Sequence, residues 1–87
     1  MQSSEKKKHF CMAIASVVTI LRSDKKQFEI ATSSDVPVSV ISVLEKGVKD
    51  PQITTIFKLA EAFGMKSSEF MQLVEKELPE GFSLIEK

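Results

Sequence analysis

Few side chains in this chain have the chemistry for catalysis or metal binding. Among its 87 residues there is one histidine, His9, and one cysteine, Cys11, while the acidic residues are spread along the chain. There is no glycine-rich phosphate loop, and no nucleophile lies at a useful spacing from a general base. A cysteine-based zinc site needs more ligands than the chain carries. We therefore expect a protein that is not an enzyme and has no metal, no cofactor and no small-molecule substrate.

The lone cysteine favours a structural role. Cys11 lies in an apolar run from Phe10 to Ala15, where a thiol is expected to be buried and inert. One cysteine cannot form an internal disulfide, so a reducing cytoplasm is the natural compartment.

Basic side chains are concentrated in the first part of the chain. The formal net charge is zero, but residues 1–26 hold six Lys and Arg against Glu5 and Asp24, a local charge of +4. Residues 27–87 hold six basic and ten acidic side chains, a local charge of −4. A zero net charge by itself gives no support to nucleic-acid binding, so the positions of the charges matter more than their sum.

The apolar spacing predicts five helices in one all-α domain. They are expected over residues 7–23, 26–33, 36–46, 51–63 and about 67–78. Gly47 suits the left-handed position after the third helix, and Gly64 ends the fourth. Asp50 is a good N-cap for the fourth helix, and Pro51 is a good first residue.

Apolar side chains at helical spacing define the expected inner faces of the last two helices. In the fourth helix they are Ile53, Ile56, Phe57, Ala60 and Phe63, and in the fifth they are Phe70, Met71, Val74 and Leu78. The remainder after Pro79 is too short for another helix. We interpret Phe82 to Ile85 as a small strand or a packed extended tail.

The start of the first helix imitates a secretory signal. A basic stretch, KKKH, precedes about twelve mostly apolar residues, and Ala13-Ile14-Ala15 imitates a cleavage site. That site lies inside the apolar run and not after it, and the run is too short to span a bilayer. We therefore favour a buried helix and expect no membrane association.

Projection at 100° per residue separates two faces of the third helix. The expected core face holds Val40, Ile41 and Leu44, and the opposite face holds Val38, Ser39, Ser42, Val43 and Lys46. A helix this short cannot be buried all round in so small a domain. The second face is therefore expected to point outward.

One segment resembles the helix-turn-helix core of the phage repressor and Cro class, also called Xre-type regulators. It runs from Gln27 to Met65 and reads QFEIATSSDVPVSVISVLEKGVKDPQITTIFKLAEAFGM. The matching positions are Gln27, Ile30, Ala31, Val36, Ile41, Ser42, Glu45, Gly47 and Pro51, with KLAEAFGM at residues 58–65. No single matching position is specific to this family, but the match of so many positions at the same spacing is specific. The resemblance implies a five-helix lambda-repressor-like fold that binds double-stranded DNA.

The chain departs from the pattern of that family at the turn. Asp35 replaces the usual glycine, and Ser34 replaces the apolar residue before it. Aspartate tolerates a left-handed conformation, so the turn can survive. Pro37 replaces the usual Ser or Thr cap of the third helix, and we expect Asp35 to supply the cap in its place.

A second departure concerns the glutamate of the third helix. The family often pairs it with an arginine of the first helix, but that position is Ile20 here. An unpaired, half-buried carboxylate is costly. We therefore expect Glu45 to find Arg22, a backbone amide or water.

The resemblance implies DNA contacts for the outer face of the third helix. Val38 and Val43 would contact thymine methyl groups, while Ser39 and Ser42 would bond base edges or phosphates. The candidate phosphate contacts on either side are Lys25, Lys26, Gln27, Lys46 and Lys49. A single lysine is as often only solvated, but the grouping on both sides favours phosphate. Without Arg, Asn or Gln on the outer face, base discrimination per half-site would be modest.

The expected protein is a sequence-specific transcriptional regulator, a homodimer bound to two half-sites about one helical turn apart. We expect a disordered tail at 1–5, the helix-turn-helix domain at 6–78 with its motif at about 26–47, and a C-terminal extension at 79–87. The expected dimer interface comprises Phe70, Val74, Phe82, Leu84 and Ile85, where a strand could pair with its symmetry mate. The alternative is a helix-turn-helix fold used as a protein-protein interaction module, an anti-regulator or assembly factor with little DNA affinity.

Overall fold

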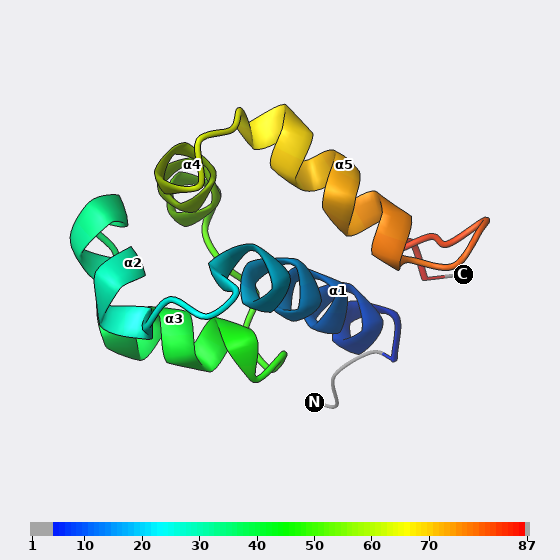
Figure 1. Cartoon of the computed structure of the whole chain (residues 1–87). Coiled ribbons are helices and arrows are strands. Elements are labelled where there is room, and N and C mark those ends of the chain that lie inside the picture. Colours follow the sequence, from blue (N-terminus) through cyan, green and yellow to red (C-terminus); the bar gives the residue numbers. More distant parts are fainter. Residues whose placement is uncertain (1–4, 87) are drawn as a thin grey trace.

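Five helices pack so that their principal contacts form a closed ring (Figure 1). This computed structural model describes residues 5–86, so the expected disordered tail lies outside the described residues apart from Glu5. The helices are α1 (Glu5–Arg22), α2 (Gln27–Ser34), α3 (Val38–Glu45), α4 (Ile53–Ala62) and α5 (Ser67–Glu77). α1 packs against α3 and α5, α2 packs against α3 and α4, and α4 packs against α5. The predicted five-helix, all-α architecture is confirmed.

All five helices contribute to one core. Its buried residues are Ala13, Ile14, Val17, Val18, Ile30, Val36, Ile41, Leu44, Ile56, Leu59, Ala60, Phe70 and Val74. Burial stabilises the β-branched part of α1, which has modest helix propensity of its own. Cys11 is buried as predicted, and burial raises the pKa of its thiol. No helix within residues 5–86 is long and apolar enough to cross a membrane.

The fourth helix begins later than the sequence predicted. Its N-cap is Gln52, whose backbone is extended at φ −72° and ψ 154°, and no side chain caps it. Pro51 therefore precedes the helix, and Asp50 is not its cap. The Asp50 carboxylate instead lies 3.8 Å from the Lys7 ammonium of α1. The predicted Asp50-Pro51 start was wrong by two residues.

The buried face of α4 is also rotated from the predicted one. Ile56 and Ala60 are buried as expected, together with Leu59. Ile53, however, is 71% exposed, and Phe57 is 57% exposed. The helix carries apolar residues over a wider arc than its neighbours α2 and α5 cover. Two large apolar side chains at the edge of that arc are left in solvent.

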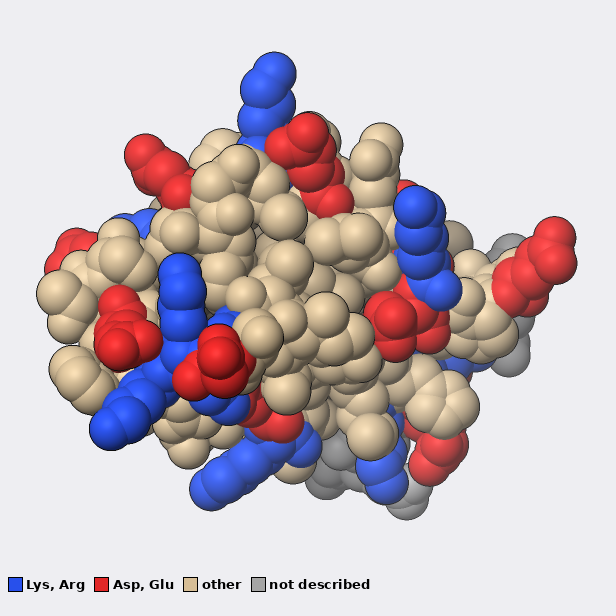
Figure 2. Space-filling view, viewed as in Figure 1, with Lys and Arg blue, Asp and Glu red and all other residues tan. Residues whose placement is uncertain are grey.

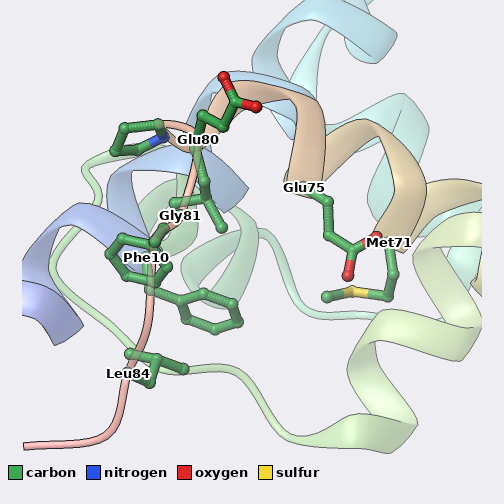
Figure 3. A pocket seen from close by; sticks show the side chains of 9 residues that line it. Phe10, Met71, Glu75, Glu80, Gly81 and Leu84 are labelled. Carbon is green, nitrogen blue, oxygen red and sulfur yellow. The ribbon is translucent and has the colours of Figure 1, made fainter.

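The C-terminal segment is an extended tail and not a strand. No strand occurs within residues 5–86, and residues 82–86 have no regular secondary structure. The Ile85 carbonyl oxygen accepts a hydrogen bond from Lys6 Nζ at 2.6 Å, and the Ile85 N–H donates to Ser83 Oγ at 3.2 Å. The tail thus returns to the start of α1. Between them lies a cavity of about 450 Å³, lined by Phe10 of α1 and Met71 of α5 (Figure 3).

Candidate nucleic-acid interface

α3 presents one face to the core and the other to solvent. Ile41 and Leu44 are fully buried, and Val40 is partly buried against the core. On the outer side Val38 is 42% exposed, Ser39 and Lys46 are exposed, and Ser42 and Val43 are half-buried. The predicted division of this helix into two faces is confirmed.

The turn before α3 depends on a left-handed aspartate. Asp35 has φ 61°, and its N–H donates to the Ala31 carbonyl oxygen at 3.0 Å, which closes α2. The predicted left-handed conformation is confirmed, but the predicted capping of α3 by Asp35 was wrong. Its carboxylate lies 3.5 Å from Lys58 Nζ of α4. Pro37 occupies the N-cap with φ −58°, and no side chain caps α3.

The turn after α3 rests against α1. Gly47 has φ +73°, as its left-handed position requires. A Cβ atom there would lie 3.0 Å from the Met12 Cγ atom and 3.3 Å from its Cα atom. This close approach fixes the end of α3 on the first half of α1.

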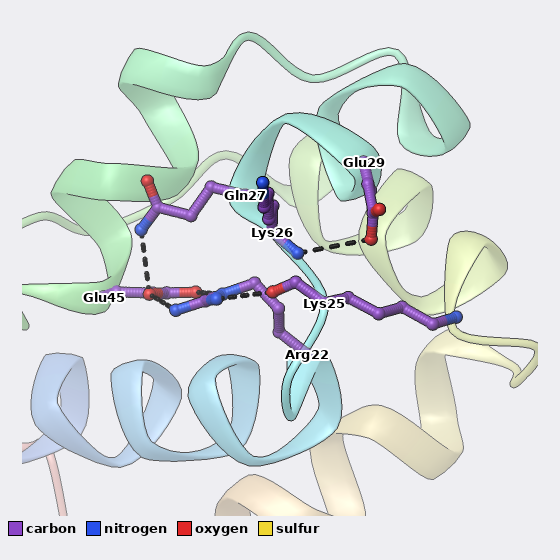
Figure 4. A network of polar contacts seen from close by, with 6 residues as sticks. All are labelled: Arg22, Lys25, Lys26, Gln27, Glu29 and Glu45. Carbon is purple, nitrogen blue, oxygen red and sulfur yellow. Dashed lines mark hydrogen bonds and ion pairs between the residues drawn. The ribbon is translucent and has the colours of Figure 1, made fainter.

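A polar network joins α1, α2 and α3 behind the outer face (Figure 4). Arg22 Nε donates to Glu45 Oε2 at 2.6 Å, and Arg22 Nη2 donates to Glu45 Oε1 at 2.7 Å. The Gln27 amide nitrogen donates to the same Oε1 atom at 2.9 Å. Arg22 Nη1 also donates to the Lys25 carbonyl oxygen at 2.7 Å. Arg22 is therefore the partner of Glu45, one of the expected possibilities, and the network holds both ends of the α1–α2 connection.

The network makes Glu45 a stable anion. The hydrogen bond from Arg22 lowers the pKa of the Glu45 carboxyl, and the bond from Gln27 lowers it further, against burial, which raises it. The same pairing raises the pKa of Arg22. Only 10% of the Glu45 side chain and 20% of the Arg22 side chain are exposed, so solvent screens this bidentate pair weakly.

The four candidate lysines precede α2 or follow α3 in the chain. Lys25 and Lys26 are exposed immediately before α2, and Lys46 and Lys49 are exposed after α3. Figure 2 shows Lys and Arg side chains projecting from the lower left edge of the view, where Figure 1 places α2 and α3, with acidic side chains among them. The fifth candidate, Gln27, is half-buried, and its amide nitrogen already donates to Glu45.

Ser34 is a polar residue in an apolar place. It is buried at the end of α2, and its Oγ atom has no hydrogen-bond partner among the described residues. In the family that the sequence resembles, this position usually holds an apolar residue. The buried hydroxyl is therefore an unfavourable element of the turn.

Two residues of the expected dimer interface are buried within the chain. Phe70 and Val74 have no exposed surface, because they pack in the core where α5 meets α1 and α4. Their side chains cannot contact a second copy in this conformation, so that part of the prediction was wrong. Leu84 and Ile85 are exposed, and Phe82 is half-buried.

The sequence reasoning missed the exposed apolar residues at the start of α4. Ile53 and Phe57 line a groove of about 190 Å³ together with Phe10 and Met71. Phe10 and Met71 also line the cavity beneath Leu84. Ile53 and Phe57 therefore border one hollow and Leu84 borders another, the two hollows share Phe10 and Met71, and the exposed Ile85 follows Leu84 in the tail. We call the surface that carries Ile53, Phe57, Leu84 and Ile85 the α4–tail surface.

Comparison with known proteins gives one match. A family model described as helix-turn-helix matches residues 22–70, more than half of the chain. The matched span begins at Arg22, includes α2, α3 and α4, and ends at Phe70. No curated protein and no solved structure matches the chain.

Proposed function

Because the chain belongs to the Xre-type helix-turn-helix family of DNA-binding regulators, we propose that it regulates transcription in the cytoplasm as a sequence-specific homodimer. Each copy places the outer face of α3 in the major groove of one half-site. The two half-sites are inverted, as two-fold symmetry of the protein requires, and lie about one helical turn apart.

The exposed outer face of α3 is the observation that carries this proposal. Val38, Ser39 and Lys46 remain open to solvent, although Ile41 and Leu44 on the opposite side of the helix are fully buried. The clamp from Arg22 to Glu45 fixes the orientation of this face against α1. A rigid helix with one free face is what docking into the major groove needs.

Phosphate contacts from the lysines would position this face. Lys25 and Lys26 precede α2, and Lys46 and Lys49 follow α3. Arg22 joins the Lys25 carbonyl oxygen to Glu45 at the end of α3, so the first pair can contact the DNA backbone near that end of the helix. Gln27 adds to the first pair. Its amide nitrogen uses one hydrogen on Glu45, and the second hydrogen can bond a phosphate oxygen.

We propose the α4–tail surface as the dimer interface, in place of the buried Phe70 and Val74. Its four exposed apolar side chains offer roughly 400–500 Å² per copy, and two copies with their polar rim approach the ~1,200 Å² of the smallest stable interfaces. The groove also includes Asp50 and Pro51, which follow closely after the end of α3. In this dimer the two-fold axis must place both copies of α3 on one side, so that both can reach the DNA.

A salt titration with a random-sequence duplex tests DNA binding. With four lysines per copy, about eight phosphate contacts per dimer predict a slope near −7 for log affinity against log salt concentration. Affinity should then fall by about 10⁴-fold between about 50 and about 200 mM salt. No measurable binding at low salt would refute the proposal and favour a protein-interaction module.

A matched pair of variants locates the contacts. The double variant Lys46→Ala/Lys49→Ala should reduce the steepness of the slope by about 4, since it removes four phosphate contacts per dimer. The double variant Lys66→Ala/Lys76→Ala removes the same charge from exposed positions at the two ends of α5 and should leave the slope unchanged. Equal effects of the two variants would place the DNA elsewhere.

A further inference from the structure

The outer face of α3 combines hydroxyl groups with apolar edges. At 100° per residue, Ser42, Lys46 and Ser39 lie along the middle of this face, and Val38 and Val43 lie on its two edges. Val38 is well exposed, and Val43 is partly exposed. Both valines therefore present methyl groups at the borders of a polar strip.

The polar residues of this strip cannot discriminate strongly among bases. A serine hydroxyl both donates and accepts, so it can bond several of the groups that the base pairs present. Lys46 follows the last residue of α3 and is one of the lysines proposed to contact phosphate. No residue of the outer face can make the bidentate Arg–guanine or Asn–adenine pair.

Thymine is the one base whose major-groove edge carries an apolar group. Its C5-methyl group marks each A·T pair in the groove, and aliphatic side chains contact it favourably. Here we propose that α3 reads thymine through this methyl group, with Val38 and Val43 as the specificity-determining residues. The inference rests on the proposed function and names the class of operator, duplexes with thymine at fixed positions of each half-site.

The expected size of the effect follows from the burial of one methyl group. Removing a methyl from such a contact should weaken binding by about fourfold. One such thymine in each half-site of a dimer site gives about 16-fold when both are replaced. This discrimination between bases is smaller than that of a bidentate hydrogen-bonded pair. It is what a face without Arg, Asn or Gln can provide.

Deoxyuridine provides the test, because it keeps every hydrogen-bonding group of thymine and lacks only the methyl. Duplexes enriched by the wild-type protein from a random pool at low salt are resynthesised with deoxyuridine at each recurrent thymine. The proposal expects recurrent thymines and a loss of about fourfold for each one replaced. Equal affinity for the thymine and deoxyuridine duplexes, or enriched sequences without a common thymine, would overturn it.

Variants connect the effect to the two valines. Val38→Ala/Val43→Ala should still bind DNA with the wild-type salt slope but should distinguish thymine from deoxyuridine less than the wild type does, because each shorter side chain retains only one methyl group. The control Val48→Ala, an exposed valine just beyond α3, should distinguish them as the wild type does. Unchanged discrimination in the double variant would overturn the assignment of the valines. If no pool binds at low salt, the proposed DNA-binding function itself fails, which is a separate outcome.

Discussion

At the scale of single residues, the carboxylate of Glu45 links three helices. Arg22 at the end of α1 and Gln27 at the start of α2 both donate to it from opposite ends of a four-residue connection. A partly buried bidentate pair is stronger than an exposed ion pair, because both charges are shielded from water and salt. The orientation of α3 relative to α1 and α2 therefore depends on one anion.

Removing the charge of Glu45 should weaken the fold. We expect Glu45→Gln to lower the free energy of unfolding by about 2 kcal/mol, because charged hydrogen bonds from Arg22 are lost. The control Lys58→Ala breaks the exposed Lys58–Asp35 pair and should cost no more than about 0.5 kcal/mol. Urea denaturation near pH 7 measures both. Equal losses would contradict the central role of Glu45.

The stabilisation by Glu45 should also depend on pH. In the folded protein the pKa of this carboxyl lies below its ordinary value of 4.5, chiefly because Arg22 bonds the anion. A lowered pKa means that the stabilisation is fully present above pH 4.5 and is lost as the pH falls through the folded-state pKa. The difference in unfolding free energy between the wild type and Glu45→Gln should thus shrink from about pH 5 to about pH 3. A constant difference over this range would argue against the assigned pairing.

Ser34 offers a substitution that should stabilise the protein. Ser34→Ala removes a buried hydroxyl that has no partner among the described residues, and we expect about 1 kcal/mol of added stability. The neighbouring Ser33 is exposed and its hydroxyl donates to the Ile30 carbonyl oxygen at 3.3 Å, so Ser33→Ala makes the same change in helix propensity where the hydroxyl has a partner. Thermal or urea unfolding compares the two. A gain no larger than that of Ser33→Ala would show that the hydroxyl is satisfied in solution.

At the scale of helices and turns, the sequence predicted where the helices lie better than which of their faces are buried. All five helices begin and end within two residues of their predicted bounds, and Asp35 and Gly47 adopt the left-handed conformations expected of them. The apolar spacing could not show which side of α4 is buried, because the apolar residues of this helix cover a wider arc than its neighbouring helices can bury. The neighbouring helices select Leu59 and leave Phe57 exposed, and that choice depends on tertiary packing.

The pairing of Glu45 shows the same limit. The position where the family usually has arginine is Ile20, which is exposed here, and the arginine stands two residues later. Arg22 reaches the carboxylate because it lies at the very end of α1, where the chain turns towards α2. Charge complementarity suggested Arg22 as one partner among three, but only the geometry of that turn selects it.

Close packing at Gly47 gives a prediction about the turn that ends α3. An alanine there must adopt φ +73°, and its Cβ atom would also meet Met12 at 3.0–3.3 Å. Gly64→Ala is the control, since Gly64 has φ +77° but nothing within 4 Å of the added atom. Both variants should lose about 1 kcal/mol from the left-handed backbone, and Gly47→Ala should lose at least about 1 kcal/mol more. Equal losses in urea denaturation would mean that the contact between the turn and α1 is loose.

At the scale of the whole molecule, the α4–tail surface and the outer face of α3 are two regions of different chemistry. The α4–tail surface is apolar and hollowed, while the outer face of α3 is polar and flanked by lysines. The first is suited to a second copy of the chain and the second to DNA. Separate variants can therefore test dimerisation and DNA binding.

Dimerisation should depend on Phe57. We expect Phe57→Glu to shift the sedimentation coefficient from that of a dimer to that of a monomer, since it puts a charge in an apolar interface. Phe28 of α2 is matched to it, with 58% of its surface exposed against 57%, and it lies outside the α4–tail surface. Phe28→Glu should leave the dimer intact. A monomeric wild type, or a dimeric Phe57→Glu variant, would contradict the proposed interface.

The most direct test of DNA binding through α3 places one negative charge on its outer face. Ser39→Glu and Ser68→Glu are matched, because each serine is exposed and is the second residue of its helix, where an acid favours folding. Fluorescence anisotropy at low salt gives the Kd of each variant for one random-sequence duplex. We predict that Ser39→Glu, which puts a negative charge on the face proposed to enter the major groove, weakens binding by at least about tenfold, while Ser68→Glu on α5 binds like the wild type. Equal affinities of the two variants would contradict the account.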